Sequence, residues 1–409
     1  MAMSIWPTVL QEPQLRRLLG GQALADFADW LDYIAIAAVL AFGWQAGPMV
    51  FALLAAAMGL PYLLVGPLAG VMVDRVATRP VLIISNIGRA VATLAMVFAP
   101  GWQVLLVLVA LRSGVDAFFT PAKQAAIQAL APKDSLMAAN GASHAINQIS
   151  KILAPALGGA AMIWLSPQNL FAINTGLSVL AALLMMQLAP IERRLTAGKQ
   201  SIWADLGDAT AFLRRRAILQ VALAMMGVGY FAIFFYDTLL APLTRDFGLS
   251  QVHLGAAIAA SGAGGVAGAL VLGLANITRP FRIVALVSWL SGLGVAALGW
   301  MQMSVIVPSP VLFVGLFVPL GFASGLALVS YRTIIQTEAG EDQIGRITAL
   351  SEAVNTLALL TAPFLGAWLA QASSIGAAWI CGGAIMLGVG VAAWRQRGYL
   401  LAFGGVRRL

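Results

Sequence analysis

Three aspartates recur at every third position in an apolar stretch near the start of the chain. Asp26, Asp29 and Asp32 belong to the sequence GQALADFADWLD (21–32). In an α-helix, positions three apart differ by about 60° around the axis, so the three carboxylates share one face. Crowding and loss of hydration both favour the protonated form of such acids. We expect Asp29 and Asp32 to exchange protons, while Asp26 either joins them or bonds to a neighbouring helix.

The alternative is a structural role, in which an acid pairs with a base of another helix and fixes the packing. Candidate bases in later apolar stretches are Arg89, Arg112 and Lys151. Arg112 and Asp116 are four residues apart, a spacing at which two side chains of one helix can pair. We expect Lys151 to face the acids of the first helix across a central cavity.

The chain as a whole has too few charged residues for a water-soluble protein. It contains 409 residues, of which 60% are hydrophobic and 10% are charged, whereas soluble domains carry about 25% charged residues. Its mean hydropathy is +0.89. The lipid bilayer is the solvent that accommodates such a composition. The single cysteine, Cys381, excludes a disulfide framework.

Twelve stretches are long and apolar enough to cross a bilayer as helices, which need about 20 such residues. They lack the alternation of a barrel strand, so we expect helices. The predicted spans are residues 18–42, 48–73, 81–99, 102–120, 138–164, 169–189, 217–242, 252–275, 280–302, 310–331, 345–370 and 375–394.

Basic residues follow every second span. The connections after spans 2, 4, 6, 8 and 10 contain Lys or Arg, and those after spans 1, 3, 5, 9 and 11 contain none. Only the connection after span 7 breaks the pattern, with Arg245 beside Asp246. We assign Lys123 to the connection after span 4. Because basic loops stay in the cytoplasm, this pattern predicts a multi-pass protein of the cell membrane with both termini inside. It also accounts for the net charge of +8 without a nucleic-acid partner.

The two halves of the chain resemble each other. NQISKILAPALGG (147–159) matches NTLALLTAPFLGA (355–367) in the second half. We predict a six-helix bundle over 1–189, a cytoplasmic linker with an amphipathic helix over 190–216, and a second six-helix bundle with a short cytoplasmic tail over 217–409. The alternative for the linker is disorder. Internal repeats are common in secondary transporters, which bind substrate between the halves.

The turn between the second and third spans carries a recognisable pattern. Gly70, Asp74, Arg75 and Arg79 resemble the signature between helices 2 and 3 of the major facilitator superfamily. The resemblance covers nearly the whole chain. It implies an all-α integral membrane fold of twelve transmembrane helices, in two pseudo-symmetric six-helix bundles around a central cavity. It also implies that this turn is a cytoplasmic gate whose partner is the end of helix 11, near Arg346.

Two residues of this turn depart from the family pattern. Ala77 stands where the family usually has Gly, and Pro80 stands where a second base is common. Both changes predict a stiffer turn.

The fifth span carries a second family motif. Its sequence SKILAPALGG resembles the antiporter pattern G-x-x-x-G-P-x-x-G-G. Pro155, Gly158 and Gly159 match this pattern, while Ser150 and Ala154 replace glycines. The match favours antiport without fixing it.

Two longer stretches resemble one group of transporters within the superfamily. GQALADFADWLD (21–32) and the run from FFTPAKQ to LMAANG (118–141) are similar to macrolide-efflux-type drug:proton antiporters of the superfamily. Many exporters of the family carry an arginine in helix 4 that is linked to proton coupling, which implies that role for Arg112. Lysophospholipid flippases and siderophore exporters have similar stretches, so the resemblance leaves the substrate open.

The second half of the chain has fewer charges within its spans. Asp237 lies in the aromatic stretch YFAIFFYDTLL (230–240), whose rings suit an amphipathic substrate or pack against lipid and neighbouring helices. His144 is expected to make local hydrogen bonds. The residues predicted to line a substrate cavity are Asp116, Lys151, Tyr236, Asp237, Glu352 and Asn355.

Small residues and prolines predict how the helices pack. Pro155 and Pro363 occupy equivalent positions in the repeat, and with Gly158 and Gly159 they predict kinks where the cavity closes. The run SGAGGVAGAL (261–270) has no following Lys, so it predicts close helix packing rather than a phosphate site.

These features predict a secondary active transporter that exports hydrophobic or amphipathic small molecules, such as drugs or macrolides, by alternating access coupled to protons. The alternatives of the same fold are a lysophospholipid or lipid flippase and a siderophore exporter, and an uncoupler separates the proton-coupled mechanism from an uncoupled flippase. We expect no enzyme, because the two histidines are distant and the loops hold no catalytic cluster. We also expect no metal and no cofactor, and a monomer in the bilayer.

Overall fold

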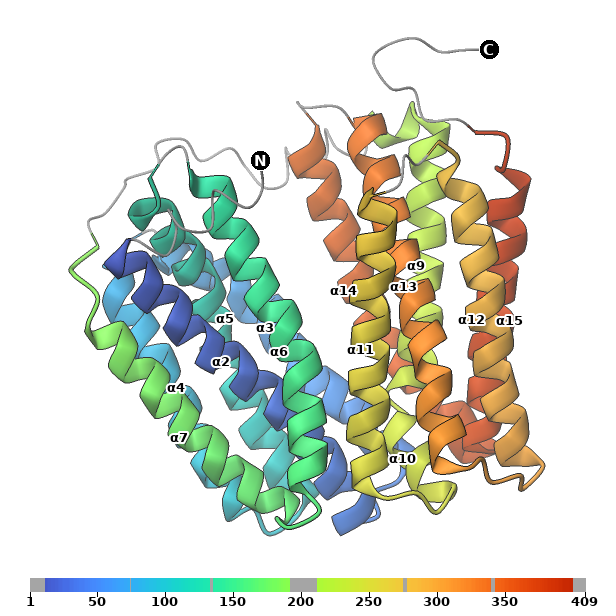
Figure 1. Cartoon of the computed structure of the whole chain (residues 1–409), viewed down its shortest axis with the longest axis horizontal. Coiled ribbons are helices and arrows are strands. Elements are labelled where there is room, and N and C mark those ends of the chain that lie inside the picture. The colour runs from blue at the N-terminus through green and yellow to red at the C-terminus, as the bar shows by residue number, and fades with distance from the viewer. Residues whose placement is uncertain are drawn as a thin grey trace. The chain divides into compact units, whose positions relative to one another are not determined.

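The computed structural model describes residues 12–73, 75–132, 135–191, 212–274, 278–339 and 343–399, and these residues contain helices and no strands (Figure 1). Twelve of the helices are long: α2 (Pro13–Ala38), α3 (Pro48–Val73), α4 (Thr78–Val97), α5 (Trp102–Leu130), α6 (Leu136–Ala161), α7 (Pro167–Met186), α9 (Ala217–Asp237), α11 (Gln251–Leu274), α12 (Pro280–Met303), α13 (Pro310–Ala339), α14 (Ile344–Ala372) and α15 (Ile375–Arg395). A short π-helix, η2 (Val39–Gly43), continues α2, and α10 (Leu240–Asp246) follows α9.

The long helices occupy the twelve predicted positions. Ten of them are long and apolar enough to cross a membrane, with mean hydropathies between 1.5 and 2.2. The other two, α2 and α6, contain 26 residues each and are interrupted by polar and charged side chains. Such side chains are costly in contact with lipid, and many of them are buried in protein: Gln22, Asp26 and Asp32 of α2, and Ser143 and Ser150 of α6.

The fourth span is longer than expected. We ended it at residue 120, where the sequence becomes more polar, but α5 continues to Leu130. Lys123 therefore lies inside a helix and is buried, so its assignment to a connecting loop was wrong. Apolar content indicates where a span ends. The helix itself can continue into polar sequence, because its backbone hydrogen bonds do not depend on apolar side chains.

The chain divides into two compact units. Among the described residues, the first unit contains 12–46, 53–191 and 254–259, and the second contains 47–52, 212–253 and 260–399. In the first unit α2 packs on α6 and α7, and α4 packs on α5 and α7. In the second unit α9 packs on α14 and α15, and α12 packs on α13 and α15. The two patterns are the same for helices of equivalent order, which agrees with the repeat in the sequence.

The boundaries predicted for the two bundles remain a prediction. Most of the linker, with the amphipathic helix expected there, lies outside the described residues. Its described end contributes Phe212 and Leu213, which pack against the apolar core of the second unit.

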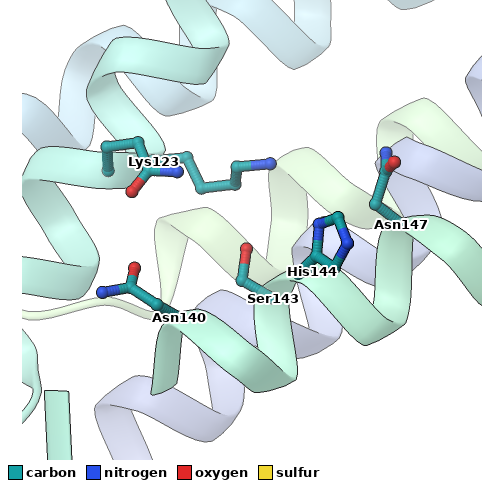
Figure 2. A pocket seen from close by; sticks show the side chains of 6 residues that line it. Lys123, Asn140, Ser143, His144 and Asn147 are labelled. Carbon is teal, nitrogen blue, oxygen red and sulfur yellow. The ribbon is translucent and has the colours of Figure 1, made fainter. Parts of the chain in front are cut away.

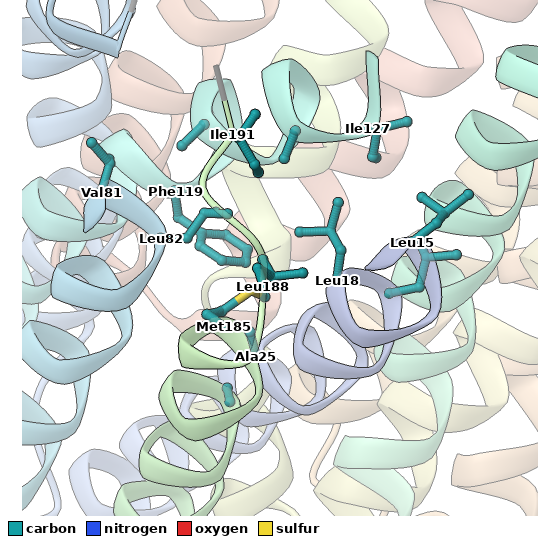
Figure 3. Packing of buried hydrophobic residues seen from close by; sticks show 14 of the residues in the cluster. Leu15, Leu18, Ala25, Val81, Leu82, Phe119, Ile127, Met185, Leu188 and Ile191 are labelled. Carbon is teal, nitrogen blue, oxygen red and sulfur yellow. The ribbon is translucent and has the colours of Figure 1, made fainter. Parts of the chain in front are cut away.

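An apolar core fills one end of the first unit (Figure 3). Leu15 and Leu18 of α2, Leu82 of α4, Phe119 of α5 and Met185 of α7 are all buried within it. These five residues alone join four helices that are distant in sequence, and Val73 of α3 and Ala139 of α6 belong to the same core. It fixes α2, α4 and α5 relative to one another, which matters because these helices carry the charged residues described below.

The carboxyl end of α7 is bound by polar side chains of two other helices. Arg79 of α4 donates to the carbonyl of Met186 at 2.6 Å, and Arg17 of α2 donates to the carbonyl of Gln187 at 2.8 Å. Carbonyls at the end of a helix have no partner within the helix, and cations are favoured there by the helix dipole. These contacts hold the last helix of the first unit.

Glycines bring α11 and α13 together in the second unit. A Cβ atom added to Gly321 would lie 1.9 Å from the carbonyl oxygen of Ser261, and one added to Gly268 would lie 2.3 Å from that of Phe322. Only residues without a side chain permit this approach. The prediction that the run 261–270 serves close helix packing is confirmed.

Candidate functional site: a charge cluster within the first unit

Five ionisable side chains meet inside the first unit, and we call them the charge cluster: Asp29, Asp32, Arg89, Arg112 and Asp116. Arg89 of α4 bridges Asp29 of α2 and Asp116 of α5, and its Nη1 lies 3.1 Å from Oδ1 of Asp116. Arg112 of α5 contacts Asp29 and also Asp32 of α2, with 2.9 Å between its Nε and Oδ2 of Asp32. The cluster thus joins three helices through two guanidinium groups.

Neutral polar groups add contacts to the cluster, although Oδ1 of Asp32 and Nε of Arg89 have no hydrogen-bond partner among the described residues. The hydroxyl of Tyr62 in α3 donates to Asp116, and that of Thr93 in α4 donates to Asp32 at 3.2 Å. Arg89 also donates to the backbone carbonyl of Ala25 at 2.8 Å. Because buried charges need such partners, these groups help to keep the cluster ionised in an apolar surrounding.

The five side chains differ in their access to solvent. The side chain of Arg89 is fully buried and that of Asp32 is 2% exposed, whereas that of Asp29 is 29% exposed. Arg112 and Asp116 are exposed by about a tenth or less. Asp29 is therefore the most accessible acid of the cluster, and it is also the acid that both arginines contact.

The charges of the cluster do not balance. Three carboxylates and two guanidinium groups give a net charge of −1 when all are ionised. Arg89 with Asp116 and Arg112 with Asp32 form two neutral pairs, and Asp29 remains as the surplus carboxylate. A proton on Asp29 would make the cluster neutral. Since a surplus buried charge is costly, this arrangement favours uptake of one proton.

Packing of uncharged residues positions α2, which supplies two of the acids. Asn174 of α7 donates to the carbonyl of Ala28 at 2.8 Å. Gly158 of α6 faces Leu31, and a Cβ atom at this position would lie 2.7 Å from its Cδ1. The glycine of the antiporter motif thus allows α6 to approach α2 beside Asp32.

The structure brings some of the predicted coupling residues together and separates others. Asp29, Asp32 and Arg112 belong to the cluster, and Asp116, which we predicted to line the cavity, joins them. Asp26 does not: it is buried, and its carboxylate accepts a hydrogen bond from Gln22 on its own helix at 2.9 Å. Gln22 in turn donates to the carbonyl of Ser143 in α6.

Two predicted pairings were wrong. Arg112 does not pair with Asp116, because the guanidinium of Arg112 points to α2 while the carboxylate of Asp116 pairs with α4. Lys151 does not meet Asp29 or Asp32 within the described residues. It is exposed, and its Nζ lies 5.1 Å from the ring centre of Trp30. A cation over an aromatic face keeps its hydration on the other side.

The residues of the predicted gate are only partly described. Asp74 lies outside the described residues. Gly70 has open space beside it, Arg75 is exposed, and Arg79 is bound to the end of α7. Arg346 is half-buried near the start of α14. The gate therefore stays a prediction.

The predicted cavity residues of the second half are dispersed over two helices. Tyr236 packs on Trp379 of α15 with 4.9 Å between the ring centres, which agrees with the alternative that these rings pack against helices. Asp237 is the last residue of α9. Glu352 is exposed and Asn355 is half-buried on α14. Pro155 and Pro363 both lie inside their helices, α6 and α14.

Sequence reasoning missed two members of the site. Tyr62 and Thr93 contact the carboxylates, but a single Tyr or Thr in an apolar span carries no signal of its own. Arg89 was found, because a guanidinium in a span has to be paired. Its two partners were not predicted, since the pairing depends on how α2, α4 and α5 are rotated about their axes.

A model of the Major Facilitator Superfamily matches residues 18–359 of the chain. An uncharacterized MFS-type transporter, YfiS of Bacillus subtilis (strain 168), is 28% identical over 94% of this chain and 93% of its own length. Macrolide efflux protein A of Enterococcus faecalis is 27% identical over 73% of this chain and 94% of its own length. The multidrug efflux pump Tap of Mycobacterium tuberculosis (strain ATCC 25618 / H37Rv) is 28% identical over 76% of this chain and 77% of its own length.

Solved structures share the fold at lower identity. The nucleoside transporter NupG superposes with a TM-score of 0.69 at 14% identity, covering 94% of this chain and 99% of the other. A bacterial homologue of the human lysosomal transporter Spinster, in an inward-facing conformation, gives a TM-score of 0.68 at 15% identity, covering 94% and 96%.

Proposed function

Because the chain belongs to the major facilitator superfamily, and is thus a multi-pass membrane transporter rather than an enzyme, we propose that it exports hydrophobic or amphipathic small molecules in exchange for protons. Two relatives, a macrolide efflux protein and a multidrug efflux pump, support the substrate class. The charge cluster supports the coupling. We further propose a location in the cell membrane, with both termini in the cytoplasm, because basic residues follow alternate spans.

The observation that carries proton coupling is the position of Asp29 in the cluster. It is the surplus carboxylate, both arginines contact it, and 29% of its side chain is exposed. When Asp29 takes up a proton, the remaining charges form two neutral pairs. When it releases the proton, its charge again attracts Arg89 of α4 and Arg112 of α5. Protonation therefore changes how strongly α2 is held to the other two helices.

From the sequence we expected Asp29 and Asp32 to exchange protons, and we now propose that Asp29 alone does so. Asp32 is nearly inaccessible and is held by Arg112 and Thr93, so we assign it to positioning. In the proposed cycle a proton enters from the outside and leaves to the cytoplasm, and each charge moved across 100 mV supplies about 2.3 kcal/mol. The turn from Gly70 to Arg79 acts as the cytoplasmic gate, with Arg346 near its partner helix.

Transport by purified protein in lipid vesicles tests the proposal. With an imposed pH gradient, the wild-type protein should move a fluorescent cationic dye or a labelled macrolide, and a protonophore should abolish this movement. Asp29→Asn, which mimics the protonated acid, should reduce gradient-driven transport to background without lowering folded yield. Asp246→Asn is the matched control, because the side chain of Asp246 has the same 29% exposure and pairs with Arg245 outside the cluster.

Two outcomes would contradict the proposal. Protonophore-sensitive transport by the Asp29→Asn protein would remove Asp29 from the coupling mechanism. Wild-type transport that is insensitive to a protonophore would favour an uncoupled lipid flippase instead.

A further inference from the structure

A second polar site lies in the first unit, apart from the charge cluster. It is a cavity of about 420 Å³ between α5 and α6 (Figure 2). Its lining consists of Lys123 and Gln124 of α5 and Asn140, Ser143, His144 and Asn147 of α6. No carboxylate is among these residues. The cavity therefore presents a positive charge and neutral hydrogen-bonding groups.

Lys123 is the buried charge of this cavity. The residue is 8% exposed, and within the described parts of the chain its ammonium group has no carboxylate within 4 Å. Its close neighbour is the ring of Phe119, whose centre lies 5.7 Å from Nζ. Asp116 of the charge cluster attracts this ammonium group only from beyond ion-pair distance. A largely buried charge without a close partner is costly, so an anion in the cavity would supply a nearer counter-charge.

The residues of α6 are spaced to face this ammonium group. Asn140, Ser143, His144 and Asn147 follow the i, i+3, i+4, i+7 pattern of one helix face. Lys123 extends from α5 toward this face, from which the four side chains project along successive turns (Figure 2). Amide, hydroxyl and imidazole groups donate hydrogen bonds from several directions, as the oxygens of a tetrahedral anion require.

We propose that this cavity is a binding site for a phosphate-bearing anion, with Lys123 as the charge and the α6 side chains as hydrogen-bond donors. A lysine ammonium group binds phosphate as a point charge. The volume exceeds that of a single phosphate group, which leaves room for a glycerol or similar moiety attached to it. The two sources of such a group are the headgroup of an anionic phospholipid and a soluble phosphate ester.

One aromatic residue, Phe119, is close to both the cavity and the charge cluster. The ring of Phe119 is a neighbour of both Lys123 and Arg89, whose Cζ is 5.4 Å from the ring centre. Both cations therefore use one buried aromatic ring. An anion bound to Lys123 would sit one side chain away from the arginine that holds Asp29 and Asp116.

Thermal unfolding of the full-length protein in detergent tests the site. Phosphatidylglycerol is one ligand, with phosphatidylcholine as its control, and glycerol 3-phosphate is the other, with chloride at equal ionic strength as its control. A ligand that binds the folded state raises Tm. We expect one of the two phosphate ligands to raise the Tm of the wild-type protein, and the arm that does so identifies the source.

Lys123→Gln should weaken the apparent affinity about tenfold or more, as expected for loss of a charged hydrogen-bond partner. Lys151→Gln, which changes the exposed lysine of α6, should leave the affinity unchanged. Asp29→Asn should also leave it unchanged, so the result does not depend on proton coupling. If Lys123→Gln fails to fold, Asn147→Leu should weaken binding while retaining the buried charge.

The proposal is wrong if neither phosphate ligand stabilises the wild-type protein. It is equally wrong if Lys123→Gln and Asn147→Leu respond to the effective ligand as the wild-type protein does, because that binding would be unspecific.

Discussion

The two units use the same pattern of helix contacts but hold their helices together with different chemistry. In the first unit, α2, α4 and α5 are joined by buried arginines and aspartates. In the second unit, α12 contacts α15 and α13 contacts α11 through residues without side chains. A Cβ atom on Gly299 of α12 would lie 2.5 Å from the carbonyl oxygen of Gly376 in α15, and Gly325 of α13 is as close to α11.

The difference indicates a division of tasks. Glycine contacts are short-range and insensitive to pH, so they favour a unit whose helices keep one arrangement. Ion pairs change with protonation, so a unit built on them can respond to a proton. One packing pattern therefore accommodates two kinds of helix contact, and each prediction below compares a change in one with a matched change elsewhere.

The largest effect is expected for the buried arginine of the cluster. Arg89→Gln leaves the carboxylates of Asp29 and Asp116 without their shared cation, and removal of one partner of a buried ion pair costs about 3–5 kcal/mol. The matched change in the second unit, Arg332→Gln, removes an exposed charge and should alter stability by less than about 0.5 kcal/mol. Thermal unfolding and folded yield in detergent measure both. Equal stability of the two variants would contradict a structural role for the cluster.

The second-largest effect on stability is expected for a glycine of the second unit. Gly321→Ala places a methyl group against the backbone of Ser261, which cannot rotate away, so we expect a loss of about 3 kcal/mol, the upper end for overpacking. Gly315 lies on the same helix with open space around it, and Gly315→Ala should stabilise that helix by about 0.5–1 kcal/mol. The two changes in Tm should therefore have opposite signs. A shift of the same sign would mean that the α11–α13 contact is not as close as described.

The two acids of α2 provide an internal test within the first unit. Asp32→Asn removes the charge that Arg112 and Thr93 contact in a buried position, at a cost of about 2 kcal/mol. Asp29→Asn removes only the surplus charge and should be nearly neutral for stability. Denaturation of both variants under one condition measures the difference. If Asp29→Asn is the more destabilised protein, then Asp29 is not the surplus carboxylate.

The smallest effect is expected for a hydroxyl at the edge of the cluster. Tyr62 donates one neutral hydrogen bond to Asp116, whose charge is also paired with Arg89, so Tyr62→Phe should cost about 1 kcal/mol or less. Tyr399→Phe removes a comparable hydroxyl from Glu338 in the second unit. Transport measured over a range of pH separates the two, because only the change beside Asp116 should alter the profile. If transport by the two variants depends on pH in the same way, then the hydroxyl of Tyr62 has no part in proton exchange.

The membrane fold was predictable because it rests on composition and length. Apolar runs located all twelve long helices, and the repeat of Pro155 and Pro363 located equivalent helices in the two halves. The ends were less accurate where a helix continues into polar sequence, as α5 does. The sequence of the Gly264 and Gly268 region also predicted its role, since only close packing explains so many small residues within a span.

The charge cluster was only partly predictable. Asp29, Asp32 and Arg112 were found because charges in a span are unusual. Their pairing was not, because it depends on the rotation of α2, α4 and α5, which apolar sequence constrains weakly. Lys151 shows the same limit: its position in a span indicated a partner, and the structure gives it the ring of Trp30 rather than an acid.

The separation of the charge cluster along the chain has a consequence for biogenesis. An aspartate at the centre of a spanning helix opposes insertion by about 2.5–3.5 kcal/mol, and α2 carries three aspartates in its sequence. The arginines that compensate two of them belong to α4 and α5, which leave the ribosome later. We infer that α2 cannot settle in the bilayer alone and has to be retained near the insertion machinery until α5 is made. Changes at Arg89 or Arg112 would then act first on the topology of the nascent chain.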